Sequence, residues 1–278
     1  MAIVFLAVSS VAAADDSEEP KKPKKSSREK LEELRKDYQP YAGNLYPYQP
    51  MYFAMGTDPE KSKFQVSFRY QFIKADGDLA EKHPWVTGFN LAYTQTSFWD
   101  LQSESKPFED TSYKPEFFYL SPFIVFGPNW ARGFQSQTGY RHESNGQAGD
   151  QSRSTNFIYA KLHWIFDLGK DYALLFAPEA FVYVWNEDDS NPDLDKYRGY
   201  FDLKVMIAQK DGFSLATNYQ HGTKGFSVRT EFTYPLHRFF TPNLELYFFA
   251  QRFDGYAESL LDFRDKKHAT RIGFSLVR

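Results

Sequence analysis

The chain has 278 residues, a formal net charge of −3 at pH 7 and no cysteine. The lack of cysteine excludes disulfide scaffolds, cysteine-ligated zinc and thiol nucleophiles, and the small net charge gives no electrostatic reason to expect a nucleic-acid partner. No apolar run is long enough for a transmembrane helix, yet aromatic residues make up 19% of the chain, which is high for a soluble domain. A transmembrane β-barrel stays possible. Its apolar lipid-facing residues alternate with polar ones, so the hydropathy averaged over the whole chain does not reveal them.

Two segments precede any regular pattern. Residues 2–14 are apolar and end in three alanines before Asp15, which is typical of a secretory signal peptide with a small-residue cleavage site. A buried first strand is the alternative, but the polar tract that follows gives it no partner. Residues 15–42 are rich in charge and proline, which predicts a flexible arm; its lysines could contact anionic headgroups, although a solvated arm is the simpler interpretation. We expect a signal peptide at 1–14, an arm at 15–42 and one barrel domain at 43–278.

From residue 51 onward, apolar and polar residues alternate with a period of two. Between residues 64 and 72 the even positions are Phe, Val, Phe, Tyr and Phe, and the odd positions are Gln, Ser, Arg and Gln. Many such stretches exceed the usual soluble strand of about five to six residues and match a tilted membrane crossing. We predict twelve strands, at 51–56, 63–72, 86–98, 115–126, 131–142, 154–166, 173–185, 197–208, 212–221, 226–235, 243–254 and 269–277. The expected fold is all-β, a twelve-stranded antiparallel transmembrane β-barrel.

The connections between these strands predict which end faces outward. Short connections at 127–130, 167–171 and 209–212 alternate with longer ones at 99–114, 143–153, 186–196 and 255–268, and outer-membrane barrels have short inner turns and long outer loops. A long inner connection at 73–85 and a short outer one at 222–225 depart from this pattern. Charged residues on the opposite register from the apolar ones are expected to fill the lumen; they are Arg69, Lys161, Arg198, Lys204, Arg229 and Glu231.

Three polar residues occupy the lipid-facing register near the outer rim. Phe134 and Tyr140 set an even-numbered outward face on strand 131–142, which also carries His142 and, if the strand continues, Ser144. On strand 154–166 the same reasoning turns Asn156 outward. Because the loop 143–153 joins these strands, we expect the three side chains to lie near one another.

Serine, histidine and an amide are the parts of a nucleophilic hydrolase. An imidazole takes the proton of the serine hydroxyl, and a third group holds the imidazole in the right tautomer. An asparagine oxygen serves this last role without adding charge at a lipid-facing position. A single rim histidine is usually a plain interfacial residue, so the register alone leaves both interpretations open.

The residues around this trio resemble the signature of the outer-membrane phospholipase A family. The resemblance rests on Tyr140-Arg-His-Glu-Ser-Asn-Gly146 followed by Ser152-Arg-Ser-Thr-Asn156. It extends to Asn44-Leu-Tyr-Pro-Tyr48, Tyr93-Thr-Gln-Thr-Ser-Phe-Trp99, Asn191-Pro-Asp193 and Gly255-Tyr-Ala-Glu-Ser-Leu-Leu-Asp262. The resemblance implies a twelve-stranded barrel that hydrolyses the sn-1 and sn-2 acyl esters of phospholipids, depends on calcium, and is activated as a homodimer in the bacterial outer membrane.

The family's functional residues carry over to matching positions. The resemblance implies that His142 is the general base, Ser144 the nucleophile, Asn156 the residue that orients His142, and the Gly146 amide an oxyanion donor. The resemblance further implies three calcium ligands. They are a backbone carbonyl matching Gln147, a hydroxyl matching Ser152, and a carbonyl of the other subunit at or near Ser105. A second calcium site would use Asp150 with Asp188 or Asp189. It is in doubt, because Gly149 stands where the family has an acidic residue.

Gln95 lies on the odd-numbered lipid face that Phe89, Leu91 and Tyr93 define. An unpaired amide in lipid is costly, whereas a hydrogen bond across a two-fold interface would satisfy it. Snorkelling to the rim is the alternative that register alone leaves open. The resemblance implies that this position is the family's dimer-interface glutamine.

The leading hypothesis is therefore a calcium-dependent outer-membrane phospholipase. A non-enzymatic barrel, either a porin or a structural protein, is the alternative. A soluble secreted lipase is disfavoured, because the sequence has no Gly-x-Ser-x-Gly nucleophile elbow.

Overall fold

The computed structural model describes residues 43–58, 61–101, 103–105, 107–125, 131–186 and 190–278. The predicted signal peptide and arm, residues 1–42, lie outside this part of the chain, so their assignment stays a prediction. Among the described helices, none has the length and apolar character needed to cross a membrane.

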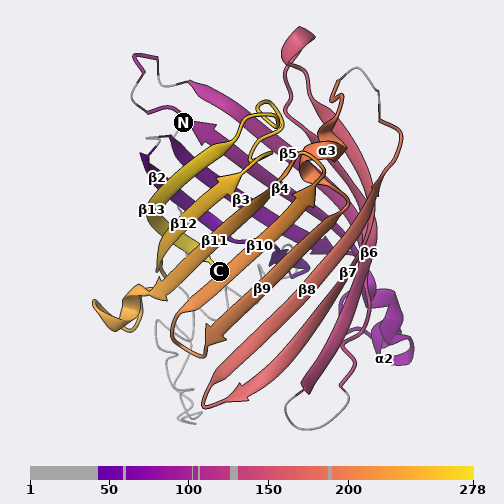
Figure 1. Cartoon of the computed structure of the whole chain (residues 1–278). Coiled ribbons are helices and arrows are strands. Elements are labelled where there is room, and N and C mark those ends of the chain that lie inside the picture. Colours follow the sequence, from indigo (N-terminus) through magenta and orange to yellow (C-terminus); the bar gives the residue numbers. More distant parts are fainter. Residues whose placement is uncertain (1–42, 59–60, 102, 106, 126–130, 187–189) are drawn as a thin grey trace, which may run out of the picture. The chain divides into compact units, whose positions relative to one another are not determined.

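The described residues form one antiparallel sheet of thirteen strands (Figure 1). The strands are β1 (Leu45–Pro47), β2 (Met51–Asp58), β3 (Ser62–Gln71), β4 (Phe89–Trp99), β5 (Phe108–Leu120), β6 (Ala131–Ser144), β7 (Ser154–Gly169), β8 (Tyr172–Tyr183), β9 (Phe201–Gln209), β10 (Ser214–Gly222), β11 (Gly225–Pro235), β12 (Tyr247–Gly255) and β13 (Lys267–Val277). The helices are short: α2 (Asp78–Lys82), η2 (Pro84–Gly88), η3 (Gly149–Gln151), α3 (Leu194–Arg198) and η4 (Leu236–Arg238). In Figure 1, α2 and α3 lie at opposite ends of the barrel.

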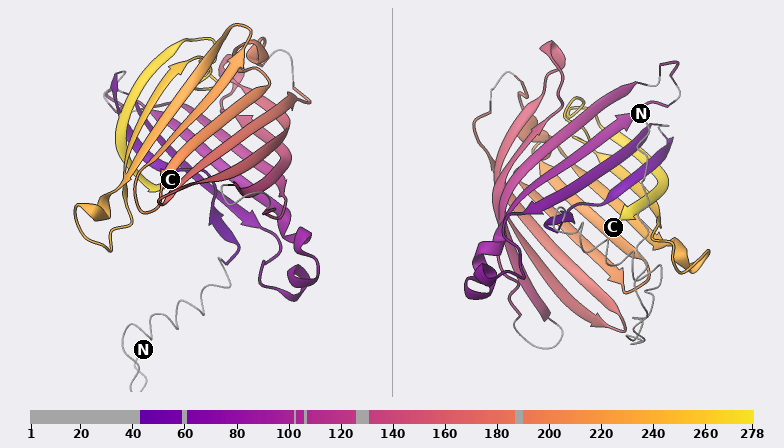
Figure 2. Two further views of the ribbon diagram at one scale, coloured as in Figure 1. Left: turned by 60° about the horizontal axis from the view of Figure 1, so that its bottom comes forward. Right: turned by 180° about the vertical axis from the view of Figure 1, so that it is seen from behind.

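The sheet closes on itself. β13 pairs with β2, so the last and first barrel strands lie side by side, and β3 pairs with β4 (Figures 1 and 2). One edge of β3 is shared: Gln65 pairs with Tyr52 of β2, and Tyr70 pairs with Leu45 of β1. β1 and β2 therefore pair with different parts of the same edge of β3, and β1 does not count as a separate barrel strand. The predicted twelve-stranded antiparallel barrel, β2 to β13, is confirmed.

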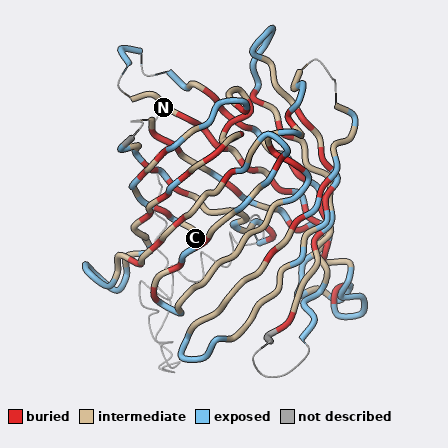
Figure 3. Tube along the Cα trace, viewed as in Figure 1, coloured by how far each residue is buried: buried red, intermediate tan, exposed pale blue. Residues whose placement is uncertain are grey.

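The alternation of the sequence becomes an apolar outside and a polar inside. On β7, Ile158 and Leu162 are exposed toward the outside, whereas Phe157 and Tyr159 are buried within the barrel. Figure 3 shows the same change from buried to exposed along the strands. The lipid-facing and interior-facing registers therefore follow directly from residue parity.

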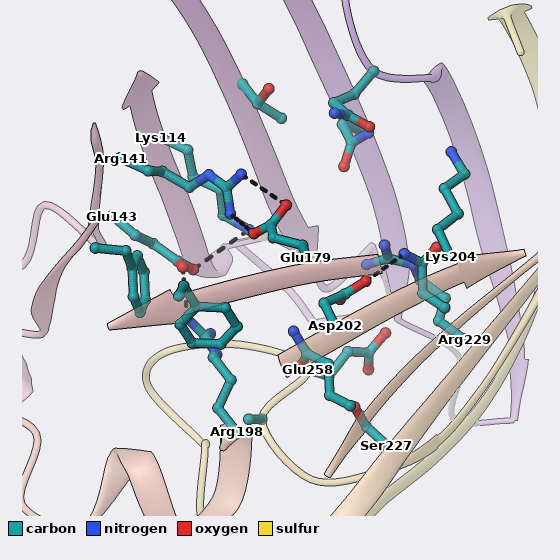
Figure 4. A pocket seen from close by; sticks show the side chains of 18 of the residues that line it. Lys114, Arg141, Glu143, Glu179, Arg198, Asp202, Lys204, Ser227, Arg229 and Glu258 are labelled. Atoms are coloured by element: carbon teal, nitrogen blue, oxygen red, sulfur yellow. Dashed lines mark hydrogen bonds and ion pairs between the residues drawn. The ribbon is translucent and has the colours of Figure 1, made fainter. Parts of the chain in front are cut away.

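Ion pairs fill the interior (Figure 4). Arg141 Nε lies 2.5 Å from Glu116 and its Nη1 lies 2.9 Å from Glu179, and Arg198 Nη1 lies 2.7 Å from Glu143. The predicted lumen residues Lys161, Arg198, Lys204, Arg229 and Glu231 line the interior cavity, and Arg69 packs on the ring of Tyr46. Paired charges that meet across the interior suit a plugged barrel better than an open pore.

Three strands have a boundary that differs from the prediction by four residues or more, and the boundaries of the others differ by three residues or fewer. β5 runs from Phe108 to Leu120 and not over 115–126. It ends early because Pro122 follows closely and cannot donate to the ladder, and its earlier start shortens the predicted outer connection 99–114. β9 begins at Phe201 and not at 197, since Tyr197 and Arg198 belong to α3. β12 begins at Tyr247 and not at 243.

The two ends of the barrel also differ less in loop length than predicted. The inner connection after β5 covers residues 121–130, not the four of the predicted turn, and the one after β11 covers 236–246 and contains η4. Connection length therefore distinguishes the outer end of the barrel from the inner end less clearly than predicted.

Candidate active site

The three predicted polar residues meet on the outward face of β6 and β7. These strands pair over their whole outer halves, with His142 opposite Asn156 and Ser144 opposite Ser154. The side chain of Asn156 faces outward, because residues two positions apart on a strand share a face and Ile158 is 45% exposed. The intervening Glu143 points into the barrel and is buried. Pairing register thus brings together residues that are separated by a loop in the sequence.

His142 and Asn156 are in direct contact. His142 Nδ1 lies 2.8 Å from Asn156 Oδ1. Because an amide oxygen only accepts, the proton of a neutral His142 lies on Nδ1, and Nε2 is free to accept another. Between described residues, Ser144 Oγ makes no hydrogen bond with His142; it accepts one from the Gly146 N–H at 3.2 Å.

Gly146 places a backbone donor beside Ser144. Its φ is +68°, in the left-handed region, and a Cβ at this position would stand 2.8 Å from the ring of Tyr113. Tyr113 is itself the β5 neighbour of Ser144 in the sheet. Both the backbone conformation and the close ring require glycine here, so the N–H beside the Ser144 hydroxyl has a fixed direction.

The loop from 145 to 153 is folded around one buried side chain, Asn145. Its Nδ2 donates to the Gln151 carbonyl at 2.8 Å, and its Oδ1 accepts from the N–H groups of Gln147 and Arg153 at 3.3 and 2.9 Å. The Gln147 carbonyl and the Ser152 hydroxyl make no hydrogen bond to the described part of the chain. Two hard oxygen donors are thus held on one ordered loop, which suits calcium's preference for oxygen ligands in flexible geometry.

The other predicted calcium ligands are less constrained. Ser105 is exposed on the connection between β4 and β5, and Asp150 is exposed in η3. Asp188 and Asp189 lie outside the described residues. Within the part of the chain that the structure describes, no three His, Cys, Asp or Glu side chains are grouped to hold a metal.

Gln95 faces outward as predicted, but its amide already has partners within the chain. Tyr93 Oη donates to Gln95 Oε1 at 3.1 Å, and Gln95 Nε2 donates to Ser97 Oγ at 3.2 Å. Thr111 Oγ1 lies 3.0 Å from the same Ser97 oxygen. We call these four residues the Gln95 ladder. Side chains two residues apart on one strand share a face, and this lets the ladder form without a partner molecule.

Sequence reasoning missed three residues around Asn156. Tyr140 Oη donates to Asn156 Oδ1 at 2.5 Å, and the Trp185 carbonyl and Asn186 Oδ1 accept from Asn156 Nδ2 at 3.2 and 3.3 Å. Tyr140 shares the outward register and could have been found by parity. Trp185 was predicted to end strand 173–185, but β8 ends at Tyr183 and both Trp185 and Asn186 follow it in an irregular segment, where alternation does not identify their contacts.

Comparison with known proteins matches nearly the whole barrel. A family model described as Phospholipase A1 matches residues 30–276. Phospholipase A1 of Escherichia coli (strain K12) is 32% identical over 236 residues, covering 81% of this chain and 72% of that protein. Phospholipase A1 of Klebsiella pneumoniae is 29% identical over 238 residues, covering 81% and 72%.

Solved structures agree with this match. The outer membrane phospholipase of Salmonella typhi, a dimer with bound calcium, superposes with a TM-score of 0.68 at 25% identity, covering 84% of this chain and 92% of that one. Outer membrane phospholipase A of Escherichia coli gives the same TM-score and identity, with 84% and 94% covered. The fold, the family and the phospholipase class expected from the sequence are confirmed. The chain belongs to the phospholipase A1 family and is a phospholipase of the outer membrane, where its barrel crosses the bilayer many times.

Proposed function

We propose that the chain hydrolyses the sn-1 and sn-2 acyl esters of phospholipids at the outer leaflet, with Ser144, His142 and Asn156 as its catalytic triad. The 2.8 Å contact between His142 Nδ1 and Asn156 Oδ1, on the face that also carries Ser144, supports this most directly. A lipid ester reaches that face from the bilayer without entering the barrel.

The proposed reaction uses Nε2 of His142 as the base. It takes the proton of Ser144 Oγ as that oxygen attacks the ester carbonyl carbon, and it then gives the proton to the leaving lysophospholipid oxygen. A water molecule activated by the same nitrogen cleaves the acyl-enzyme, which releases the fatty acid and restores Ser144. Asn156 keeps the proton of His142 on Nδ1 throughout.

Two contacts must change when substrate binds. The Ser144 hydroxyl has to leave the Gly146 N–H and turn toward His142. The freed N–H then becomes available to the oxyanion that forms on the substrate carbonyl. Catalytic hydrogen bonds are often long in substrate-free sites and shorten in the complex with substrate, so this rearrangement is compatible with the proposed roles.

We propose calcium as the cofactor. The Gln147 carbonyl and the Ser152 hydroxyl would hold it on the loop that Asn145 organises, and the bound ion would supply positive charge near the developing oxyanion. Gly149 offers no side-chain ligand at the second site that the family resemblance implies, which would leave Asp150 with Asp188 or Asp189. We therefore propose only the first site.

We further propose that the active form is a homodimer joined through the outward face of β4. Within the Gln95 ladder, Ser97 and Thr111 are buried, whereas Tyr93 and Gln95 stay partly exposed on the lipid-facing register. A partner amide would be favoured over lipid at Gln95. Gln95 donates one N–H to Ser97 and keeps a second for such a partner. In this arrangement a carbonyl at or near Ser105 of the second copy would complete the calcium site, so that activity would depend on association.

Covalent labelling tests the role of Ser144. An alkyl fluorophosphonate should modify the folded protein at one position, and mass spectrometry of the digested protein should place the adduct on Ser144. Calcium should accelerate the labelling. An adduct on a different serine, in protein that turns over phospholipid, would contradict the proposal.

A further inference from the structure

The outer end of β7 extends beyond its neighbour β8. Ladder pairing between these strands ends at Phe157 with Tyr183, and just beyond it the Val184 N–H donates to the Asn156 carbonyl at 3.0 Å. The Asn156 N–H is left without a backbone acceptor on that side. The side chain of Asn186 supplies the acceptor for this N–H. Its Oδ1 accepts from the Asn156 backbone N–H at 2.7 Å, and its Nδ2 lies 3.4 Å from the Asn156 carbonyl. The Asn186 side chain therefore satisfies the Asn156 N–H that the β7–β8 ladder leaves without a backbone acceptor.

The same residue also contacts the side chain of Asn156. Asn186 Oδ1 accepts from Asn156 Nδ2 at 3.3 Å, and the neighbouring Trp185 carbonyl accepts from the same nitrogen at 3.2 Å. A backbone carbonyl only accepts, so the nitrogen of the Asn156 amide must lie on this side. The oxygen must then face the opposite way, where Tyr140 Oη and His142 Nδ1 meet it at 2.5 and 2.8 Å.

The backbone at Trp185 adopts an unfavourable conformation that allows these contacts with Asn156. Trp185 has a φ of 50°, in the left-handed region that non-glycine residues seldom adopt. This conformation directs the Trp185 carbonyl and the Asn186 side chain toward the same residue. The indole of Trp185 is 78% exposed, and its ring lies 5.9 Å from that of Tyr140. Strain of this kind persists where surrounding contacts hold it in place.

We propose that Asn186 is a positioning residue for the hydrolysis. It fixes the backbone and the amide orientation of Asn156, so that only an oxygen faces His142 and the imidazole keeps its proton on Nδ1. A reversed amide would present N–H groups to Nδ1 and favour the tautomer in which Nε2 is protonated and no longer a base. The inference rests on the proposed triad and adds to it a side chain that, together with the Trp185 carbonyl, determines which way the Asn156 amide points.

The test compares two replacements of Asn186 in phospholipid hydrolysis by the full-length refolded protein. Asn186→Leu keeps the approximate size but removes the acceptor, and it should lower kcat at least about tenfold, equivalent to about 1.4 kcal/mol, with KM unchanged. Asn186→Asp keeps an oxygen for both Asn156 donors and should retain kcat within about threefold of the parent. If Asn186→Leu does not fold, Asn186→Ala takes its place. Fold is checked by the shift in gel mobility on heating and by circular dichroism.

A matched control is available on the same connection. Asn191 also donates to the β7 backbone, at the Ser154 carbonyl, but it makes no hydrogen bond to Asn156. Asn191→Ala should therefore change kcat far less than Asn186→Leu. Equal losses would mean that any break in this connection has the same effect, and would overturn the inference.

A double-mutant cycle separates this inference from the proposed triad. If Asn186 acts through Asn156, Asn186→Leu should cause no further loss of kcat in an Asn156→Ala background. The full loss in both backgrounds would overturn the inference. Unchanged kcat in Asn186→Leu beside a clear loss in Asn156→Ala would overturn it too, but would leave the triad standing. Unchanged kcat in Asn156→Ala alone would instead contradict the role proposed for Asn156.

Discussion

Glu143 and Ser144 are neighbours in the chain but point to opposite sides of the barrel wall. The carboxylate of Glu143 lies inside, 2.7 Å from Arg198 Nη1 and 3.4 Å from Lys114 Nζ. Ser144 lies on the outward face with His142 and Asn156. The end of β6 that carries the proposed nucleophile is thus anchored from within by a buried ion pair.

Glu143→Ala should lower the free energy of unfolding by about 3 kcal/mol, because it leaves the buried Arg198 without its charge partner. Chemical unfolding in detergent micelles measures this value. Glu109→Ala is the control, since Glu109 and Lys61 form an exposed pair, with 31% and 38% of their side chains accessible. That pair should contribute less than about 1 kcal/mol. Similar losses in the two variants would argue against the anchoring role of Glu143.

Glu258 predicts an acid-dependent loss of stability. It lies on the connection after β12; burial would raise its pKa, but Lys63 and Arg271 hold that pKa at about 2. Because the folded-state pKa is below the unfolded value, its stabilisation is fully present above about pH 4.5 and is lost as the pH falls toward 2. Glu258→Gln should therefore be less stable than the parent at pH 7, by roughly 3 kcal/mol. The two unfolding free energies should converge near pH 2, and a constant difference between them across this range would contradict the assignment.

Gln95→Ala should weaken the proposed dimer by about 1 kcal/mol, the scale of polar contacts between membrane-embedded segments. Crosslinking yield against protein concentration in micelles gives the measurement. Leu215→Ala is the matched lipid-facing control on β10, half-way around the barrel from β4. If both variants associate like the parent, Gln95 acts only within its own ladder.

Ser152→Ala should raise the calcium concentration needed for half-maximal activity about tenfold, since one oxygen ligand is lost from the proposed site. Asp150→Asn, in the same loop, should leave this concentration unchanged if calcium occupies only that site. A rise in Asp150→Asn as large as in Ser152→Ala would instead indicate that the acid takes part in calcium binding.

The alternation of apolar and polar residues predicted the barrel and showed which side chains of each strand face the lipid. Ile158 and Asn156 share a register, and a one-residue slip would have turned both inward, so the lipid-facing position of Asn156 follows from the sequence. The same rule failed at Tyr197 and Arg198, where alternation continued into α3. A short helix before Gly199, whose φ is 72°, leaves no mark on a pattern of period two.

The surroundings of the site were harder to predict than its centre. His142, Ser144 and Asn156 lie on regular strands, where pairing determines their neighbours. Asn186 contacts Asn156 only because β8 ends early and the chain turns at Trp185. The internal partners of Gln95 were missed for a different reason: the outward face was treated as lipid alone, although Tyr93 and Ser97 share it.

Calcium-titrated hydrolysis by the Ser144→Ala variant tests the central claim most directly. The parent protein and Ser154→Ala, which alters the serine paired with Ser144 across the two strands, should both release fatty acid from detergent-dispersed phospholipid as calcium is added. Ser144→Ala should fold with the same heat-dependent gel shift and release none at any calcium concentration. Calcium-dependent release by Ser144→Ala at the parent rate would contradict the account.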